Sequence, residues 1–360
     1  MNFEDYGFYR MPPIDFDNLA DPRRSKNIFS RVFIALFTCI AASYVALFTV
    51  EILLLTVLGE ETYLYLMQHP IYSLLISSGC QYLIGFPAFF LITSKGEKWE
   101  KREKKKMSFK HLFFSLLACQ TMMMVGNVIG LTVNGMVGGL VGVAPENTIE
   151  TLVNETPIWL IFILVVVVGP TLEELVFRKV MIDRLAIFGD RSAILVSSVA
   201  FGFFHGNLYQ LFYAFFIGLV LGYVYTKTGK VIYTVILHGI INFFGSIVSP
   251  YAAQIQEKLM EYSEIIMAEG EVLPIGFLVS LLIYVFYSNL ITAAFAGGIV
   301  VLIFFIRRGG LINISDRKGL FVPRGKLFAY STFNVGAIIF YAASIMIMLA
   351  GIIFPLIKFS

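Results

Sequence analysis

The chain has 360 residues, of which 58% are hydrophobic and only 14% are charged. Soluble globular domains carry about 25% charged residues, so this composition excludes an ordinary water-soluble enzyme. The net charge of +3 is small and lies in loops beside apolar segments, which indicates membrane orientation and not nucleic-acid binding. The sequence therefore predicts an integral membrane protein with no nucleic acid among its partners.

Apolar segments of the roughly 20 residues that a bilayer requires recur along almost the whole chain, which favours membrane helices over barrel strands. The expected fold class is all-α, a polytopic transmembrane bundle of about eight or nine helices. A count of ten stays open as well, because the third and eighth segments are long, rich in glycine and expected to tilt or break. The predicted spans are 28–57, 70–94, 109–143, 157–187, 191–206, 208–226, 230–248, 273–306 and 328–355.

The spans divide the chain into four regions. Residues 1–27 are polar and proline-bearing, unlike a cleaved signal peptide, and are expected to be cytoplasmic. Transmembrane helices follow over 28–156, a core with the candidate site over 157–250, and a C-terminal region over 251–360. This last region begins with residues 252–268, whose helical periodicity fits an interfacial amphipathic helix and a packed surface loop equally well.

Lysine and arginine in the loops predict the orientation of the chain. The loops "KGEKWEKREKKKMSFK" and "RRGGLINISDRKGLFVPRGK" are strongly basic, whereas "GEETYLYLMQH" and "APENTIETLVNET" contain neither residue. Basic loops favour the cytoplasmic side, so we expect a multi-pass protein of the cell membrane with a cytoplasmic N-terminus. Cys39, Cys80 and Cys119 lie in apolar segments and offer neither a disulfide framework nor a metal site.

The segment "GPTLEELVFRKV" places charged residues in the fourth predicted span. A charged side chain near the centre of a membrane helix costs about 2.5 to 3.5 kcal/mol, so these side chains need partners. Glu174 and Arg178 are four residues apart and can pair on one face, while Glu173 points about 100° away. Pro170 either kinks the helix and opens a polar pocket or is simply tolerated. An ion pair that only fixes helix packing would explain these charges equally well, so other residues must decide.

Two of the four histidines, His205 and His238, lie inside apolar segments. The turn expected at Gly189 is sixteen residues from both Glu173 and His205, so an antiparallel hairpin would bring them to one depth, about 24 Å from the turn. His238 reaches that depth if the turn at Gly189 extends about 12 Å further than the next one. Asn242 follows His238 by one helical turn on the same face. These polar groups predict a shared functional site.

A carboxylate, two imidazoles and an amide in a shielded cavity are suited to hydrolysis. Glu173 could activate water as a general base, with His205 orienting the water or relaying its proton. His238 and Asn242 could donate hydrogen bonds to the oxyanion, while Glu174 and Arg178 would hold the helix. A zinc ion held by Glu173, His205 and His238 is an alternative, weakened by the absence of HExxH spacing; we expect no metal and no other cofactor.

Three motifs in chain order resemble the CPBP family of intramembrane glutamic endopeptidases, which includes the prenyl-protein CAAX endopeptidase. They are "EELVFR" for EExxxR, "FGFFH" for FxxxH and "HGIIN" for HxxxN, within about residues 157–250. The resemblance implies an intramembrane peptidase with Glu173 as the base and His205 as its partner. It also implies oxyanion stabilisation by His238 and Asn242. The remaining motif residues, expected to support the site, are Glu174, Arg178 and Phe201.

The expected partners are the lipid bilayer and a peptide or protein substrate, either lipidated or otherwise associated with the membrane. Two other functions stay open. The chain could be a catalytically silent scaffold or immunity protein of the same fold, because the family contains such members. A proton-coupled transporter would use the glutamate and histidines as a relay, but the chain lacks paired broken helices in two similar halves.

Overall fold

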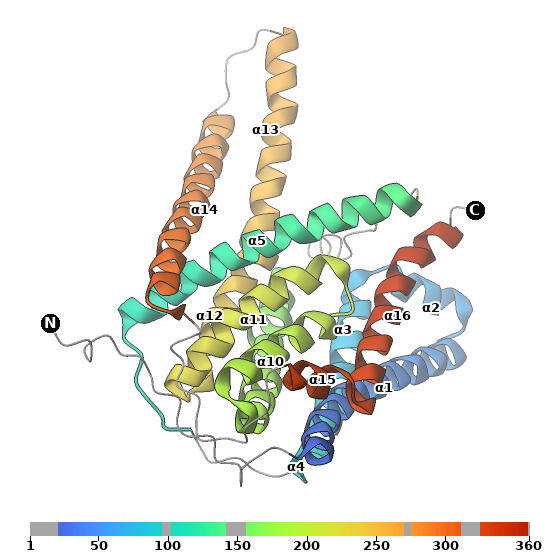
Figure 1. The fold of residues 1–360 in the computed structure, drawn as a ribbon. Helices are drawn as coiled ribbons and strands as arrows, with labels where there is room; N and C mark the ends of the chain where they lie inside the picture. Colours follow the sequence, from blue (N-terminus) through green and yellow to red (C-terminus); the bar gives the residue numbers. More distant parts are fainter. Residues whose placement is uncertain (1–20, 96–101, 142–155, 270–274, 311–324, 359–360) are drawn as a thin grey trace, which may run out of the picture.

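Figure 1 shows a computed structural model in which residues 21–95, 102–141, 156–269, 275–310 and 325–358 are described. Over these ranges the regular structure is helical and contains no strand. Eight helical segments are long and apolar enough to cross a membrane. The predicted all-α polytopic bundle is therefore confirmed. The first 20 residues of the expected cytoplasmic segment, and most of the loops at 144–156 and 307–326, lie outside the described residues.

Among the described residues, the number of full spans is eight by length and composition, because one predicted span is short. α10 (Asp190–Phe204) stands where a span over 191–206 was expected, and its 15 residues give a length of about 22 Å. The hydrocarbon layer is about 30 Å thick. The eight segments are Pro22–Leu58, Pro70–Ser94, Phe109–Leu140, Ile158–Phe188, Leu208–Thr228, Val231–Glu264, Ile275–Arg307 and Val335–Ile353.

The first helix begins six residues earlier than predicted because Asp21 caps it. The Asp21 carboxylate accepts hydrogen bonds from the backbone N–H groups of Arg23 and Arg24 at 3.0 and 3.3 Å, and a proline follows the cap. The helices of this N-terminal part are α1 (Pro22–Leu58), α2 (Glu60–Met67), α3 (Pro70–Cys80), π-helical η3 (Gln81–Gly85), α4 (Phe86–Ser94) and α5 (Phe109–Val141).

The candidate site residues Glu173, Glu174 and Arg178 lie on one long helical segment, here called the site helix. It runs without a turn through α7 (Ile158–Ile161), η4 (Phe162–Val168), α8 (Gly169–Glu174), η5 (Leu175–Ile182), α9 (Asp183–Leu185) and η6 (Ala186–Phe188). The stretches η4 and η5 are π-helical. Pro170 has no N–H to donate, and the wider π register directly before it keeps the helix continuous.

The chain then returns through α10 and continues with further helices, of which α11 and α12 contact the site helix. Residues 249–269 form a helix directly continuous with α12 and packed on α14, which excludes the loop alternative; their interfacial placement stays a prediction (Figure 1). These helices are α11 (Leu208–Thr228), α12 (Val231–Phe243), η7 (Phe244–Val248), α13 (Ser249–Glu269), α14 (Ile275–Arg307), α15 (Lys326–Thr332) and α16 (Val335–Lys358). α5 and α14 are unbroken over their described lengths.

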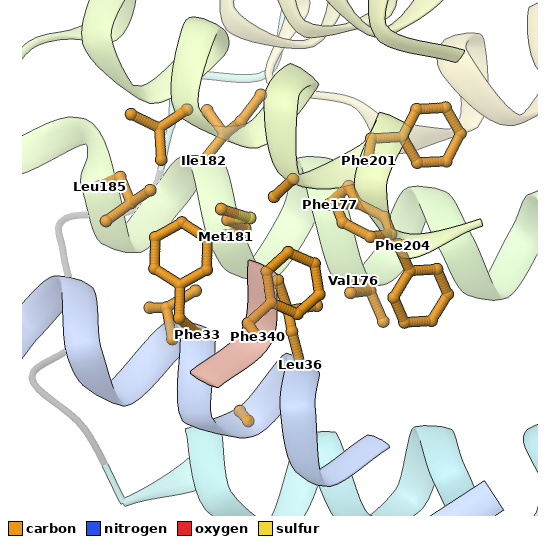
Figure 2. Close-up of a cluster of buried hydrophobic side chains, with 14 of the residues drawn as sticks. Phe33, Leu36, Val176, Phe177, Met181, Ile182, Leu185, Phe201, Phe204 and Phe340 are labelled. Atoms are coloured by element: carbon orange, nitrogen blue, oxygen red, sulfur yellow. The ribbon is translucent and has the colours of Figure 1, made fainter. Parts of the chain in front are cut away.

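The main apolar core surrounds the C-terminal half of the site helix. Figure 2 shows side chains of α1, α10 and α16 gathered around it. The first and last spans meet closely, because the backbone N–H of Gly336 donates to Ser30 Oγ at 3.0 Å. The site helix thus packs against parts of the chain that lie far apart in the sequence, α1 and α16. This apolar core contains residues of the site helix and of its neighbours, including Phe33, Leu36, Val176, Phe177, Met181, Phe201, Phe204 and Phe340.

Candidate active site

A fully buried ion pair lies at the middle of the site helix. Arg178 Nε is 3.0 Å from Glu174 Oε2, and neither side chain is exposed. The four-residue spacing places both side chains on one helix face, as predicted. Arg178 Cζ also lies 4.7 Å from the centre of the Phe201 ring, within cation–π range. Burying two charges costs several kcal/mol of desolvation, which the attraction between the two side chains must offset.

His238 of α12 lies between the two glutamates. Its Nδ1 is 3.0 Å from Glu174 Oε1, and its Nε2 is 3.7 Å from Glu173 Oε2. The pairing of Glu174 with Arg178 keeps Glu174 as an acceptor, so His238 Nδ1 is the donor in the shorter contact. This placement differs in detail from the expectation: His238 binds the supporting glutamate directly and faces the candidate base from its other nitrogen.

Phe201 of α10 joins the histidines to the charged pair. Its ring centre is 5.0 Å from that of His205 and 5.7 Å from that of His238, both in edge contacts. His205 caps the C-terminal end of α10. Gly206 follows with a φ of +57°, which lets the chain turn immediately after His205. His205 thus reaches the group through Phe201, and the structure gives no direct hydrogen bond between His205 and Glu173 in the described part of the chain.

Asn242 lies one helical turn beyond His238, and its amide contacts backbone. Asn242 Nδ2 donates to the carbonyl of Val165 at 2.9 Å. Val165 belongs to η4, and the neighbouring carbonyl of Leu164 accepts from the Tyr82 hydroxyl at 3.0 Å. Both side chains thus supply donors to the π-helical stretch before Pro170. One N–H of the Asn242 carboxamide is used there, and the second remains for another acceptor.

The sequence motifs did not point to Tyr82 or Tyr213, which both lie within range of the Glu173 charge. Tyr82 comes from η3 and Tyr213 from α11, outside the elements that carry the motifs. The chain contains 18 tyrosines, so a tyrosine in an apolar span is not distinctive. No signal in a single sequence would have selected these two.

Three elements therefore bring the predicted residues into one neighbourhood. The site helix supplies Glu173, Glu174 and Arg178; α10 supplies Phe201 and His205; and α12 supplies His238. Asn242 is held against η4 at the edge of this group. Across the ranges that the structure describes, no three His, Cys, Asp or Glu side chains are arranged to hold a metal ion.

Comparison with known proteins finds similarity over the part of the chain that carries the motifs. Residues 155–244 match the family model described as type II CAAX prenyl endopeptidase Rce1-like. The chain is also similar to the Bacillus subtilis (strain 168) protein named "Putative membrane peptidase YdiL", with 30% identity over 128 residues. That match covers 33% of this chain and 52% of the relative, so the chain spans about half the length of the curated relative it matches. No solved structure matches the chain.

The family match covers the site helix, α10, α11 and α12 up to Phe244, and therefore every motif residue described above. The resemblance based on those motifs is confirmed by an independent comparison. Residues 155–244 are therefore similar to the type II CAAX prenyl endopeptidase Rce1-like family, and part of the chain is similar to a protein named as a membrane peptidase.

Proposed function

We propose that the protein is an intramembrane endopeptidase in which Glu173 activates water. The observation that carries this proposal is the different environment of two adjacent carboxylates. Both oxygens of Glu174 face partners, Oε1 toward His238 and Oε2 toward Arg178. Glu173 Oε2 and Glu174 Oε2 are both buried and accept no hydrogen bond from any described residue, but Glu174 Oε2 lies 3.0 Å from Arg178 Nε, whereas Glu173 Oε2 lies 3.7 Å from His238 Nε2. Glu173 is therefore the carboxylate that is free to take a proton.

The gap between Glu173 and His238 suits a nucleophilic water. Their facing atoms are 3.7 Å apart, which is beyond direct hydrogen bonding and within the range that a water can bridge. In the proposed reaction, Glu173 takes a proton from this water as the oxygen attacks the peptide carbonyl carbon. The carbon–nitrogen bond then breaks, and the proton on Glu173 passes to the leaving amine.

The oxyanion that forms during the attack needs hydrogen-bond donors. His238 Nε2 faces the same space as Glu173 and can donate there in the imidazolium form, because Nδ1 already donates to Glu174; Asn242 keeps one N–H beyond its bond to Val165. His205, held against Phe201, orients the water or relays its proton. The ion pair of Glu174 and Arg178 fixes the ring of His238 rather than reacting itself.

The proposed substrate is a peptide that reaches the site from the membrane. The matched family is described by prenyl endopeptidase activity, so a prenylated C-terminal peptide is the first substrate to test, beside the same peptide without its lipid. We also propose that the N-terminus is cytoplasmic, which places this chemistry in the inner half of the membrane.

Hydrolysis of a fluorogenic peptide by purified protein in proteoliposomes tests the proposal. We expect Glu173→Gln to lower kcat by about 10²- to 10⁴-fold, the usual contribution of a general base. The matched control is Glu51→Gln, because Glu51 is a carboxylate on α1, outside the candidate site. Equal hydrolysis by the wild type and Glu173→Gln would contradict the proposal.

Two further arms of the same assay separate the alternatives. A chelator should leave the rate unchanged; loss of activity that only zinc restores would instead assign the carboxylate and histidines to a metal. If the wild type hydrolyses neither peptide while Glu173→Gln retains the cellular phenotype, the scaffold function is the correct one.

A further inference from the structure

A second group of buried charges lies at one end of the site helix, away from Glu173. Its centre is Arg102, whose side chain is 1% exposed. Arg102 Nε donates to Asp183 Oδ1 at 2.8 Å, while Nη1 and Nη2 donate to the two oxygens of Asp190 at 3.1 and 2.7 Å. The fork of the guanidinium thus binds two carboxylates at once, which a lysine cannot reproduce.

Neighbouring side chains complete this ion cluster. The Tyr225 hydroxyl and Lys179 Nζ both donate to Asp183 Oδ2, at 2.9 and 2.6 Å. Arg102 Cζ also lies 5.5 Å from the centre of the Tyr225 ring. Burial alone would lower the pKa of Arg102, but the hydrogen bonds and charges of Asp190 and Asp183 raise it. The pKa of Arg102 is therefore held above its ordinary value, so the guanidinium is charged at physiological pH.

The cluster joins the two helices that carry Glu173 and His205. Asp183 begins α9 on the site helix, ten residues after Glu173. Asp190 begins α10, fifteen residues before His205. A helix is rigid, so a shift at one end moves its whole length. The distance between Asp183 and Asp190 therefore affects the relative depth of the Glu173 and His205 side chains.

The same segment of chain also contacts the turn that precedes His238. The backbone N–H of Lys105 donates to the Thr228 carbonyl at 2.8 Å. Gly229 has a φ of +62°, and a Cβ there would lie 2.3 Å from the Glu103 carbonyl oxygen, so the turn from α11 to α12 is closed tightly over residues 102–105. α12 begins at Val231 and carries His238 two turns later.

We propose that Arg102 is a positioning residue: by binding Asp183 and Asp190 together, it sets the relative placement of the helices that carry Glu173, His205 and His238. This inference rests on the proposed function, because its effect on hydrolysis is read through those three residues. Arg102 itself lies in the segment between the second and third spans and does not contact Glu173, His205 or His238.

Steady-state kinetics of variants in this segment test the inference. Arg102→Gln removes the charge and the fork, and we expect kcat to fall about 10- to 100-fold with KM within about twofold, because small misplacements of reacting groups lower the rate strongly. Arg102→Lys keeps the charge without the fork and should fall between Arg102→Gln and the wild type. Asp190→Asn, which keeps the side-chain size, serves as a second variant if Arg102→Gln does not fold.

The matched control is Lys105→Ala, because the Lys105 side chain is 60% exposed and pairs with exposed Glu103. It should leave kcat unchanged. A purely structural role for Arg102 predicts less folded protein with an unchanged kcat per folded molecule, and that result for both Arg102→Lys and Asp190→Asn would overturn the inference.

Nitrogen NMR of ¹⁵N-histidine-labelled protein gives a readout that does not need activity. The chain has four histidines, so the signals of His205 and His238 can be assigned by substitution. Arg102→Lys and Asp190→Asn should shift both signals and leave that of His69 in place. If the wild type hydrolyses no peptide but these shifts occur, the proposed function fails and the inference about Arg102 stands; unchanged signals contradict the inference.

Discussion

Two adjacent glutamates of the site helix have different surroundings, and this difference separates their roles. Glu174 binds Arg178 and His238, whereas Glu173 only approaches His238. The cause is helix geometry, since consecutive residues point about 100° apart. Removing one partner of a fully buried ion pair typically costs about 3 to 5 kcal/mol. Substitutions at Glu174 should therefore affect folding, while substitutions at Glu173 should affect mainly the reaction.

Asn242 has two candidate roles that a substitution can distinguish. Asn242→Ala removes both the bond to the Val165 carbonyl and the remaining N–H. Loss of one oxyanion donor costs about 2.7 to 4 kcal/mol of activation free energy, or about 10²- to 10³-fold in kcat. We expect a loss of this size in peptide hydrolysis.

The control for Asn242 is Tyr82→Phe, which removes the bond to the adjacent Leu164 carbonyl and leaves the aromatic ring. Its effect should be limited to about 1 kcal/mol of folding free energy. If Asn242→Ala slows hydrolysis no more than Tyr82→Phe does, Asn242 is only a donor to the π-helical stretch.

At the scale of elements, close helix crossings fix the position of α11 behind the site. Gly126 of α5 faces the backbone of α11, where a Cβ would lie 2.3 Å from Tyr213 Cα. A backbone atom cannot move aside as a side chain does, so α5 and α11 can approach this closely only with glycine at this position. Gly126 therefore serves packing against α11, and α5 shows no break over its described length.

Gly126→Ala should therefore separate α5 from α11 and lower the free energy of unfolding by about 1 to 3 kcal/mol or more. Gly135→Ala is the matched control on the same helix, because a Cβ there has no neighbour within 4 Å. Thermal unfolding in detergent measures both. Equal unfolding temperatures for the two variants would show that the α5–α11 contact is not tight.

The elements also show what a single sequence can and cannot predict. The spans and the pairing of Glu174 with Arg178 follow from hydrophobicity and four-residue spacing. The length of α10 follows as well, because its bounds Asp190–Phe204 differ from the expected 191–206 by one residue at the start and two at the end. The bond from Asn242 to Val165 depends on the π register of η4, which leaves no mark in the residue pattern.

At the scale of the whole molecule, turns predicted to share one side of the membrane lie together. Arg102 follows the second span, Asp190 follows the site helix, and Thr228 ends α11. Arg102 binds Asp190, and the backbone N–H of Lys105 donates to the Thr228 carbonyl, so residues 102–105 contact both other turns. The basic composition of the loop around Arg102 predicts that this end is cytoplasmic. α10 thus returns the chain across the bundle despite its short length.

Labelling of introduced cysteines in oriented vesicles tests this topology. Lys105→Cys should react with a membrane-impermeant maleimide only in inside-out vesicles, and Glu61→Cys on exposed α2 only in right-side-out vesicles. The native cysteines are buried, so they provide the unlabelled control without replacement. Labelling of both positions from one side would contradict the predicted orientation.

The central claim is that residues from separate helices form one hydrolytic site. A double-mutant cycle on kcat for peptide hydrolysis tests it, with Glu173→Gln, His205→Ala and the combined variant. When two groups act as a unit, the effects of their substitutions on kcat are not additive. We therefore predict that the double variant is no slower than the slower single variant. Losses that multiply in the double variant would show that Glu173 and His205 act independently, and would contradict a shared site.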